Sequence, residues 1–577
     1  MRYIFALLLG GCYPLRDLLN RVLRFIAIKA LIIKGFFDVR CMLKNTKSPQ
    51  KVNEKLLLRI IRRNRNTEYG KLHNFKDIHS VEDYKKKIPI QRYEDFRAFV
   101  ERMYYDNESN LLTADKAVGF ARSSGSVGKP KLIPKTNRDV RIYTKYTVTR
   151  FLYLADNYLR KEGKRRMKPA RGMNLITRYD IFSPHGLPAT NVGDIPARKY
   201  FFVFPYILNL PLGKQFASDE IDVKYAFSRF ALEDEDTSYL FYVFSKGVAE
   251  LIEYIRDNWQ MLADDIENGT IDESIRVRDD IHKQLEKLMK PNPKRAAEVR
   301  KQCEKGFDET ILLRLWPNLS VISAIGTSPV FEGYTSVIHR YSEGVPYDYS
   351  IYGASEALMA AAYEINNSDQ VLLPDSCYFE FVDPDDEEAE HTLSIEELEV
   401  GKDYEVIITN QSGFYRYRFN DIIRVTGYCN KCPTITFVQR KGQLLNITGE
   451  KTNYEQMAAA LCQLEQVAET KINEWVTFID RGEKQYRYGI LLETEGCRDL
   501  GGFSDRFEDI LREVNPQYLY YEGNDLIEPP VLLMQKPGSH EEWKRARVAA
   551  GATEDQVKPV HILDTEDKRE FFLSRVI

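Results

Sequence analysis

Short apolar runs alternate with longer helical patterns along most of the chain, which is typical of a mixed α/β protein. Apolar runs bounded by turn-forming residues predict strands at Leu319–Ile325, Tyr347–Ile351, Cys377–Val382 and Tyr404–Thr409. Residues 246–308 instead carry long, charged patterns with helical spacing. We therefore expect a large mixed α/β domain with a helical subregion on its surface.

The pattern changes after Phe437, where the chain predicts a second and smaller α/β domain. Strands are predicted at residues 444–447 and 486–492, and a helix is predicted at 453–463 between them. Arg440, Lys441 and Gly442 precede these elements. We expect residues 1–439 to form the N-terminal domain and residues 440–577 to form the C-terminal domain.

The first 50 residues predict an amphipathic helical extension. Helical spacing relates the apolar residues Leu15, Leu18, Leu19, Val22 and Ile26. Basic residues interrupt every long apolar run, and no stretch reaches the roughly 20 apolar residues of a spanning helix. A helix packed on the protein is the favoured interpretation, and a helix lying on a membrane surface is the alternative. The apolar run that ends at Cys12 also resembles a short signal sequence, an interpretation that we do not favour.

The composition excludes several classes of protein. Of the 577 residues, 43% are hydrophobic and 29% are charged, as in a folded globular chain. The 82 basic and 85 acidic residues leave a net charge of −3, so we expect no nucleic-acid partner. Eight cysteines at irregular spacing predict a reducing, cytoplasmic setting. Cys429 and Cys432 have the spacing of half a zinc site, but no second pair stands at a fitting distance.

The first segment with candidate chemistry is a loop of small and basic residues. Its members are Ser123, Ser124, Gly125, Ser126, Gly128, Lys129 and Lys131. Glycines and hydroxyl residues let main-chain amides approach phosphate oxygens, and lysines compensate the phosphate charge. The glycine spacing differs from that of a P-loop, and Pro130 favours a loop between two strands. The alternative is an ordinary surface hairpin.

The second segment is Tyr352-Gly353-Ala354-Ser355-Glu356. A tyrosine face can stack on a base, a glycine turn brings the main chain near a ligand, and a glutamate can hold Mg²⁺ against phosphates. A strand end suits such a site. Taken alone, Glu356 also fits an ordinary surface carboxylate or a helix N-terminus.

The third segment is Tyr415–Asp421, in a strand-rich region. Its alternation places Tyr415, Tyr417 and Phe419 on one face and two arginines on the other. The carboxylate of Asp421 can accept both hydroxyls of a ribose. A half-exposed strand that ends in a turn explains the segment equally well.

These three segments, in this order, resemble those of the Gretchen Hagen 3 acyl-acid amido synthetases, a branch of the acyl-adenylate-forming superfamily. The resemblance runs from about residue 50 to the C-terminus. It implies the adenylate-forming fold, in which a large N-terminal domain binds ATP and the acyl substrate and a smaller C-terminal domain moves as a lid.

The resemblance also implies roles for individual residues. The loop from Ser123 to Lys131 would bind the ATP phosphates, Tyr352 and Ser355 would contact adenine and phosphate, and Glu356 would bind Mg²⁺. The other positions are the pocket residues Gly326 and Thr327, the ribose-binding Asp421, the hinge residue Arg440 and the catalytic Lys558. The usual glycine before the ribose-binding aspartate is Asn420 here, and asparagine tolerates left-handed backbone geometry. Ser126 replaces a usual threonine and keeps the hydroxyl.

The activity implied is ATP-dependent adenylation of a carboxylic acid, followed by transfer of the acyl group to an amine, in particular an amino acid. An acyl-CoA ligase would use the same adenylate with a thiol acceptor. An alternative of another class is a non-catalytic nucleotide-binding interaction protein. We expect a monomer that uses ATP and Mg²⁺, and the sequence identifies neither the acid nor the acceptor nor the base that deprotonates the acceptor.

Overall fold

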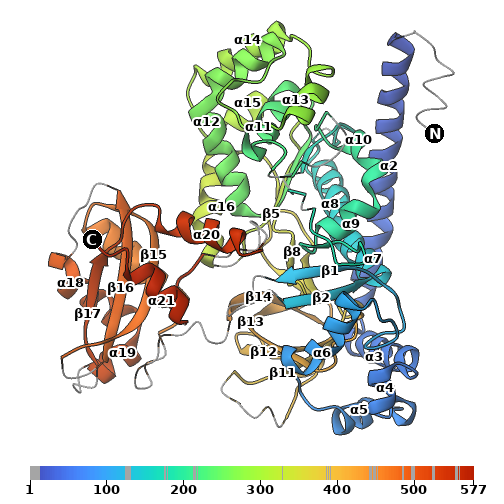
Figure 1. Cartoon of the computed structure of the whole chain (residues 1–577), viewed down its shortest axis with the longest axis vertical. Helices are drawn as coiled ribbons and strands as arrows, with labels where there is room; N and C mark the ends of the chain where they lie inside the picture. Colours follow the sequence, from blue (N-terminus) through green and yellow to red (C-terminus); the bar gives the residue numbers. More distant parts are fainter. Residues whose placement is uncertain are drawn as a thin grey trace.

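The computed structural model describes the chain from residue 13 onward (Figure 1). The gaps in this description are residues 124–130, 165, 175–176, 179, 212–215, 218, 328, 385, 387–388, 390, 441–444, 446, 448–449, 451, 484–485, 496–500, 523–526, 553–556, 558 and 564. Helices and strands alternate in both the N-terminal and the C-terminal part. The mixed α/β class that was predicted is confirmed.

The largest sheet in the described part is wholly antiparallel and lies between residues 351 and 440. Its strands, in spatial order, are β11 (Tyr378–Val382), β12 (Asp403–Thr409), β13 (Tyr417–Cys429), β14 (Cys432–Arg440), β10 (Gln370–Leu372), β9 (Leu358–Ala362) and β8 (Ile351–Gly353). Most of its residues are buried, and η3 (Ile395–Glu397) lies between β11 and β12 in the sequence. Two buried ion pairs brace the sheet: Arg416, which precedes β13, binds Glu380 of β11 at 2.9 Å, and Arg418 of β13 binds Glu405 of β12 at 2.6 Å. This sheet provides the rigid support for two of the three candidate segments.

A second sheet is parallel and supports the helical subregion. Its order is β3 (Met173–Asn174), β5 (Tyr239–Phe244), β6 (Val321–Ile325) and β7 (Tyr347–Asp348). One apolar core joins it to α11 (Val223–Glu233), α12 (Ser245–Asn268), α13 (Asp279–Glu286), α14 (Pro293–Cys303), α15 (Ile311–Leu315) and α16 (Pro329–Tyr341). The helical subregion predicted for residues 246–308 is confirmed.

The single strand predicted at Tyr347–Ile351 was wrong. The chain turns at Ser350, whose φ of 57° lies in the left-handed region. As a result β7 ends at Asp348 in the parallel sheet, and β8 begins at Ile351 in the antiparallel sheet. The apolar pattern runs through both strands, which explains why they read as one.

A third, small sheet carries the predicted phosphate loop. It consists of β2 (Lys131–Thr136), β1 (Ala117–Ser123) and β4 (Ala189–Thr190), with β1 and β2 antiparallel. The loop therefore joins two strands, as predicted. Around this sheet and the larger ones lie α3 (Pro49–Asn64), α4 (Glu68–Leu72), η1 (Phe75–Asp77), α5 (Val81–Lys87), α6 (Tyr93–Tyr105), α7 (Asn137–Tyr146), α8 (Val148–Lys161), α9 (Asp194–Lys199), η2 (Phe201–Val203) and α10 (Phe204–Ile207).

The predicted N-terminal helix is α2 (Tyr13–Asn45), which runs along the edge of the molecule (Figure 1). Ile28, Ile32, Val39 and Met42 recur at helical spacing and are buried. A Cβ atom on Gly35 would lie 2.0 Å from the carbonyl oxygen of Thr149, so glycine allows α2 to approach α8 closely. No helix in the described residues is long and apolar enough to cross a bilayer.

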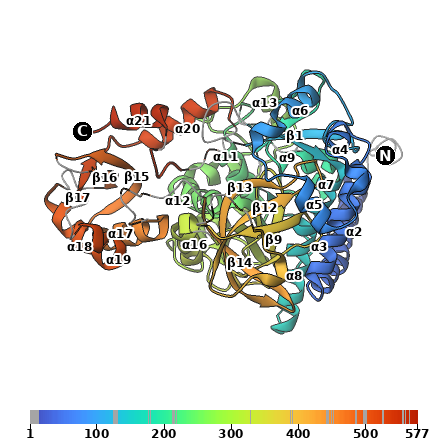
Figure 2. The ribbon, with the colours of Figure 1, turned by 90° about the horizontal axis from the view of Figure 1, so that it is seen from below.

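The C-terminal part lies to one side of the rest of the molecule (Figures 1 and 2). Its sheet has the order β15 (Lys471–Arg481), β16 (Tyr486–Glu495) and β17 (Glu528–Met534). Two apolar cores of its own lie between this sheet and α17 (Tyr454–Val467), η4 (Gly501–Phe503), α18 (Ser504–Val514), α19 (Pro516–Glu522), α20 (Ser539–Ala549) and α21 (Glu566–Leu573). The predictions of a helix at 453–463 and a strand at 486–492 are confirmed. Of the strand predicted at 444–447, the described part shows one bridge, between Leu445 and Thr452.

Candidate functional site

The turn between β8 and β9 carries the second candidate segment. Tyr352 and Gly353 end β8, and the N–H of Ala354 donates to the carbonyl oxygen of Ala357 at 2.8 Å. This hydrogen bond closes the turn around Glu356, which is 7% exposed. The segment is thus a hairpin turn in which Ser355 and Glu356 are buried, so Glu356 is neither a surface carboxylate nor at a helix N-terminus.

The main chain of this turn is fixed from two sides. The carbonyl oxygen of Glu356 accepts hydrogen bonds from Lys135 Nζ at 3.2 Å and from Asn410 Nδ2 at 3.0 Å. Burial lowers the pKa of Lys135, while the nearby carboxylates of Asp139 and Glu356 act in the opposite direction. Ser355 lies in the same turn and is also buried. The hairpin β1–β2, which supplies Lys135, is therefore held against the turn.

The carboxylate of Glu356 receives its hydrogen bond from a tyrosine. Tyr417 Oη donates to Glu356 Oε1 at 3.2 Å, and Tyr417 is the first residue of β13. A tyrosine hydroxyl satisfies one lone pair of a carboxylate without neutralising its charge. The carboxyl group of Glu356 is thus fixed on the inner side of the turn.

Asp421 lies beside Tyr352 in the interior. Tyr352 Oη donates to Asp421 Oδ2 at 2.9 Å, although 69 positions separate the two residues in the chain. The ring of Tyr352 also lies 5.9 Å from the ring of Phe437 in β14. The second and third candidate segments therefore meet at one place.

A bulge in β13 positions Asp421. Arg418 faces Ile407 and Ile422 faces Glu405, so β13 carries extra residues between these two pairs. Asn420 lies in this bulge with a φ of 69°. The expectation that asparagine provides left-handed geometry before the aspartate is confirmed.

The strands on either side of the predicted phosphate loop lie beside this site. Ser123 pairs with Lys131 across the hairpin, and the Lys131 ammonium lies 5.4 Å from the centre of the Tyr93 ring. Burial raises the pKa of Tyr93, and the nearby carboxylate of Glu356 adds to this rise. The remaining predicted loop residues, Ser124, Gly125, Ser126, Gly128 and Lys129, lie outside the described part.

Three further predicted residues adjoin the same strands. Gly326 and Thr327 follow β6, and the carbonyl oxygen of Thr327 accepts a hydrogen bond from Thr436 Oγ1 of β14 at 3.3 Å. Arg440 is the last residue of β14 and pairs with Asp421 across the ladder. The predicted hinge residue Arg440 therefore lies directly opposite Asp421, the residue predicted to bind the ribose.

The chain that follows α20 also reaches this region. Lys558 lies outside the described residues, but Gly551 is described and has a φ of 100°. A Cβ atom on Gly551 would lie 3.1 Å from Nη2 of Arg122, which precedes Ser123 in β1. The segment that was predicted to deliver the lysine therefore passes beside the end of β1 that leads into the loop.

Sequence reasoning missed the residues that hold the turn in place. Lys135 and Asn410 belong to no motif, and Tyr417 lies in the third segment without a predicted role, because each acts through a contact made far away in the chain. The only indication for Tyr417 in the sequence was its predicted position on the strand face opposite the arginines. Within the described part, no cluster of three or more potential metal ligands occurs, so the Cys429 and Cys432 pair is not part of one.

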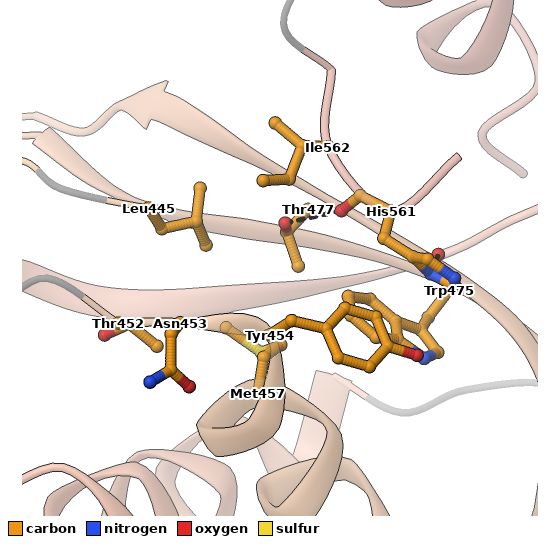
Figure 3. A pocket seen from close by; sticks show the side chains of 9 residues that line it. All are labelled: Leu445, Thr452, Asn453, Tyr454, Met457, Trp475, Thr477, His561 and Ile562. Carbon is orange, nitrogen blue, oxygen red and sulfur yellow. Dashed lines mark hydrogen bonds between the residues drawn. The ribbon is translucent and has the colours of Figure 1, made fainter. Parts of the chain in front are cut away.

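A separate small cavity lies within the C-terminal part (Figure 3). Tyr454, Trp475 and His561 stand together at one end of it, and Thr477 Oγ1 donates to the carbonyl oxygen of His561 at 2.7 Å. Its volume of about 20 Å³ is close to that of one water molecule. The cavity is far too small for a nucleotide.

Comparison with known proteins agrees with this arrangement. The GH3 family N-terminal domain matches residues 39–347, its central domain matches 370–440, and its C-terminal domain matches 455–567. The probable indole-3-acetic acid-amido synthetase GH3.1 of Arabidopsis thaliana is 26% identical over 567 residues, which cover 92% of each chain. The indole-3-acetic acid-amido synthetase GH3.2 of the same plant is 30% identical over 446 residues, which cover 72% of this chain and 78% of the relative.

Solved structures give the same result for the fold. The chain superposes on a GH3.15 acyl acid amido synthetase with a TM-score of 0.77 and 23% identity, covering 92% of this chain and 95% of the other. The N-terminal family domain alone spans more than half of the chain. The protein is therefore a member of the GH3 family, and it shares the fold of a solved GH3 acyl acid amido synthetase.

Proposed function

We propose that the protein is an ATP-dependent acyl-acid amido synthetase, which adenylates a carboxylic acid and transfers the acyl group to an amino acid. The observation that carries this proposal is the hydrogen bond from Tyr352 to Asp421, because it brings two of the three candidate segments together in the interior. The relatives support the acceptor class, since they include amido synthetases and a 4-substituted benzoates-glutamate ligase of Arabidopsis thaliana.

In the first step the carboxylate of the acid attacks the α-phosphorus of ATP. A bond forms between the carboxylate oxygen and phosphorus, and the bond to the leaving pyrophosphate breaks. Negative charge builds on the phosphate oxygens, and the main-chain amides of the loop, Lys131 and Lys558 stabilise it. Asp421 accepts hydrogen bonds from the ribose hydroxyls, and the ring of Tyr352 supports the base.

Glu356 is the residue that would hold Mg²⁺. Magnesium is commonly bound by one or two protein carboxylates together with phosphate oxygens and water. One buried carboxylate without a surrounding ligand cluster in the described part fits this mode. The ion would supply positive charge to the phosphates, and the hydrogen bond from Tyr417 fixes the carboxylate that would hold it.

In the second step the amine attacks the acyl carbonyl, the amide bond forms, the amine loses a proton and AMP leaves. Water must be excluded before this attack, because an acyl-adenylate hydrolyses readily. We assign residues 440–577 as a mobile lid that turns about Arg440 between the two steps. In this proposal the enzyme acts as a cytoplasmic monomer.

The first test is acid-dependent exchange of labelled pyrophosphate into ATP, with a panel of carboxylic acids. Asp421→Asn and Glu356→Gln should each lower exchange about a hundredfold. Asp403→Asn is the matched control, since Asp403 lies on the neighbouring strand β12 and pairs with Arg424 at the surface. Unchanged exchange in both site variants would refute the placement of the site.

The second test identifies the acceptor by mass spectrometry of the products formed with amino acids, other amines and CoA. An amide product supports the proposal, whereas a thioester alone would make the protein an acyl-CoA ligase. The absence of exchange with every acid, together with undetectable ATP binding, would favour a non-catalytic interaction protein.

A further inference from the structure

One face of α2 exposes large apolar side chains along most of the helix. The most exposed of them are Leu18, Val22, Phe25, Ile26, Ile33 and Phe37, each between 45% and 62% exposed. Their spacing places them on one side of the helix, away from the buried residues that face α8. Single exposed apolar residues are common, but a contiguous row of this length marks an interaction surface. We refer to these six residues as the apolar face of α2.

The charge of α2 differs from that of the whole protein. The helix carries seven basic and two acidic residues, whereas the chain as a whole has a net charge of −3. Arg21 and Arg40 are exposed and Lys29 is half-buried; helical spacing places Lys29 and Arg40 on the same side of the helix as the apolar face. Of the two acidic residues, Asp38 already accepts hydrogen bonds from Lys34 and from Thr149 Oγ1. The helix therefore combines an apolar row with an excess of positive charge.

A neighbouring element extends the exposed apolar surface. Phe201 and Phe202 in η2 are 63% and 61% exposed, and η2 leads directly into α10, which packs against α2. Arg198 and Lys199 precede them at the end of α9. Exposed aromatic rings beside basic residues are typical of protein segments that lie at the boundary between water and lipid.

The position of α2 leaves the rest of the molecule accessible. The helix forms the outer edge of the molecule in both views, on the side opposite the C-terminal part (Figures 1 and 2). Its 33 residues correspond to a rod of roughly 50 Å. A flat surface could therefore contact α2 along its length without touching the β15–β17 sheet.

We propose that the apolar face of α2 binds the surface of an anionic lipid bilayer, with the helix lying in the plane of the interface. Acyl chains accept the apolar face, and the lipid headgroups attract the basic residues that border it. A second copy of the chain is a poorer occupant, because pairing the same face with itself would bring two positively charged helices together. The helix lies on the bilayer and does not cross it.

The test is co-flotation of the purified full-length protein with vesicles, of phosphatidylcholine alone or of equimolar phosphatidylcholine and phosphatidylserine. We expect binding to the anionic vesicles that weakens as salt is added. Phe25→Ser and Phe37→Ser should each lower the partition coefficient about tenfold, and Arg21→Gln with Arg40→Gln should lower it about tenfold in combination. Leu519→Ser is the matched control, because Leu519 is 49% exposed on α19, on the other side of the molecule.

Circular dichroism and pyrophosphate exchange report whether each variant is folded, since none of these residues belongs to the catalytic site. Failure of the wild-type protein to bind anionic vesicles would overturn the proposal. Binding that both phenylalanine variants retain would also overturn it, because another part of the chain would then be responsible. A concentration-dependent dimer that these variants abolish, without vesicle binding, would assign the face to a second copy instead.

Discussion

We predict that ionisation of Glu474, a largely buried carboxyl group, weakens the C-terminal part as the pH rises. The residue lies in β15, and its side chain is 22% exposed. Burial raises the pKa of Glu474 from 4.5 to about 7, although Lys246 of α12 acts in the opposite direction. The other groups that face it are the carboxylates of Glu493, Glu541 and Glu250 and the imidazole of His540, whose Nδ1 lies 3.7 Å from Glu474 Oε2.

The magnitude follows from the two pKa values. A carboxyl group whose pKa is raised on folding stabilises the folded state below its unfolded pKa, and this stabilisation is lost as the pH rises through the folded pKa. A rise from 4.5 to about 7 corresponds to about 3 kcal/mol of unfolding free energy. Glu474→Gln resembles the protonated acid and should remove this loss. The variant and the wild type should therefore be equally stable near pH 4.5 and differ by up to about 3 kcal/mol above pH 7.

Native-state hydrogen exchange of peptides from β15 and β16 is the suitable assay, because a chain with several cores need not unfold in one step. At each pH the two proteins share the same intrinsic exchange rates, so any difference in their measured exchange rates reports a difference in the free energy of opening. Above pH 7 the amides of the variant should exchange on the order of a hundredfold more slowly than those of the wild type. Glu513→Gln removes an exposed carboxylate of α18 and serves as the control.

A constant difference between Glu474→Gln and the wild type at every pH would refute the reasoning, because it would show a packing effect and not an ionisation. The two histidines of this region, His540 and His561, would not produce the same dependence of stability on pH. Burial lowers the pKa of His540 to about 3 and that of His561 to about 4. Their contribution to stability is therefore lost as the pH falls below about 6.5, which is the opposite direction.

Three further predictions concern particular residues. Arg150→Ala should destabilise the protein by about 3–5 kcal/mol in denaturant unfolding. The substitution leaves the buried Asp348 without the guanidinium that binds it at 2.8 Å. An equal loss of stability in the surface variant Arg256→Ala would contradict this prediction. Asn420→Val should cost about 1–2 kcal/mol and slow pyrophosphate exchange, whereas Asn420→Gly should retain both stability and exchange because glycine accepts a φ of 69°. Gly489→Ala should lower the melting temperature of the C-terminal part by calorimetry, since its Cβ would lie 2.3 Å from the Phe478 ring; an unchanged transition would show that this ring moves aside.

Local patterns predicted the elements well where periodicity was strong. The strands predicted at Cys377–Val382 and Tyr404–Thr409 occur as β11 and β12, within one residue of the predicted bounds, because turn-forming residues border both apolar runs. The run at Tyr347–Ile351 failed, since nothing in an apolar pattern indicates that Ser350 turns the chain from one sheet into another. No neighbouring residue in the sequence signals that this serine adopts a left-handed backbone conformation.

The candidate site shows the same limit at longer range. Asn420 beside Asp421 could be interpreted from sequence, because the left-handed preference of asparagine is a local property. The support of Glu356 by Lys135 could not, since 221 positions separate the two residues. The sequence predicted which groups would meet the ligand, and only the fold shows which residues hold those groups in place.

The buried carboxylates of the N-terminal part divide into two kinds by their partners. Glu380, Glu405 and Asp348 each bind an arginine through paired hydrogen bonds. Such pairs compensate the cost of burying charge, and we assign them structural roles. Glu356 differs, because within the described residues no basic side chain forms an ion pair with it and its carboxylate accepts from Tyr417.

Burying the carboxylate of Glu356 without an ion pair costs free energy, and a cation bound beside it would recover that cost. This reasoning predicts that Glu356→Gln makes the ligand-free protein more stable in denaturant while weakening Mg·ATP binding. Glu380→Gln should instead destabilise the protein, because Arg416 would lose its buried partner. If both substitutions destabilised the protein equally, Glu356 would be one more structural carboxylate, and the metal would have to be bound elsewhere.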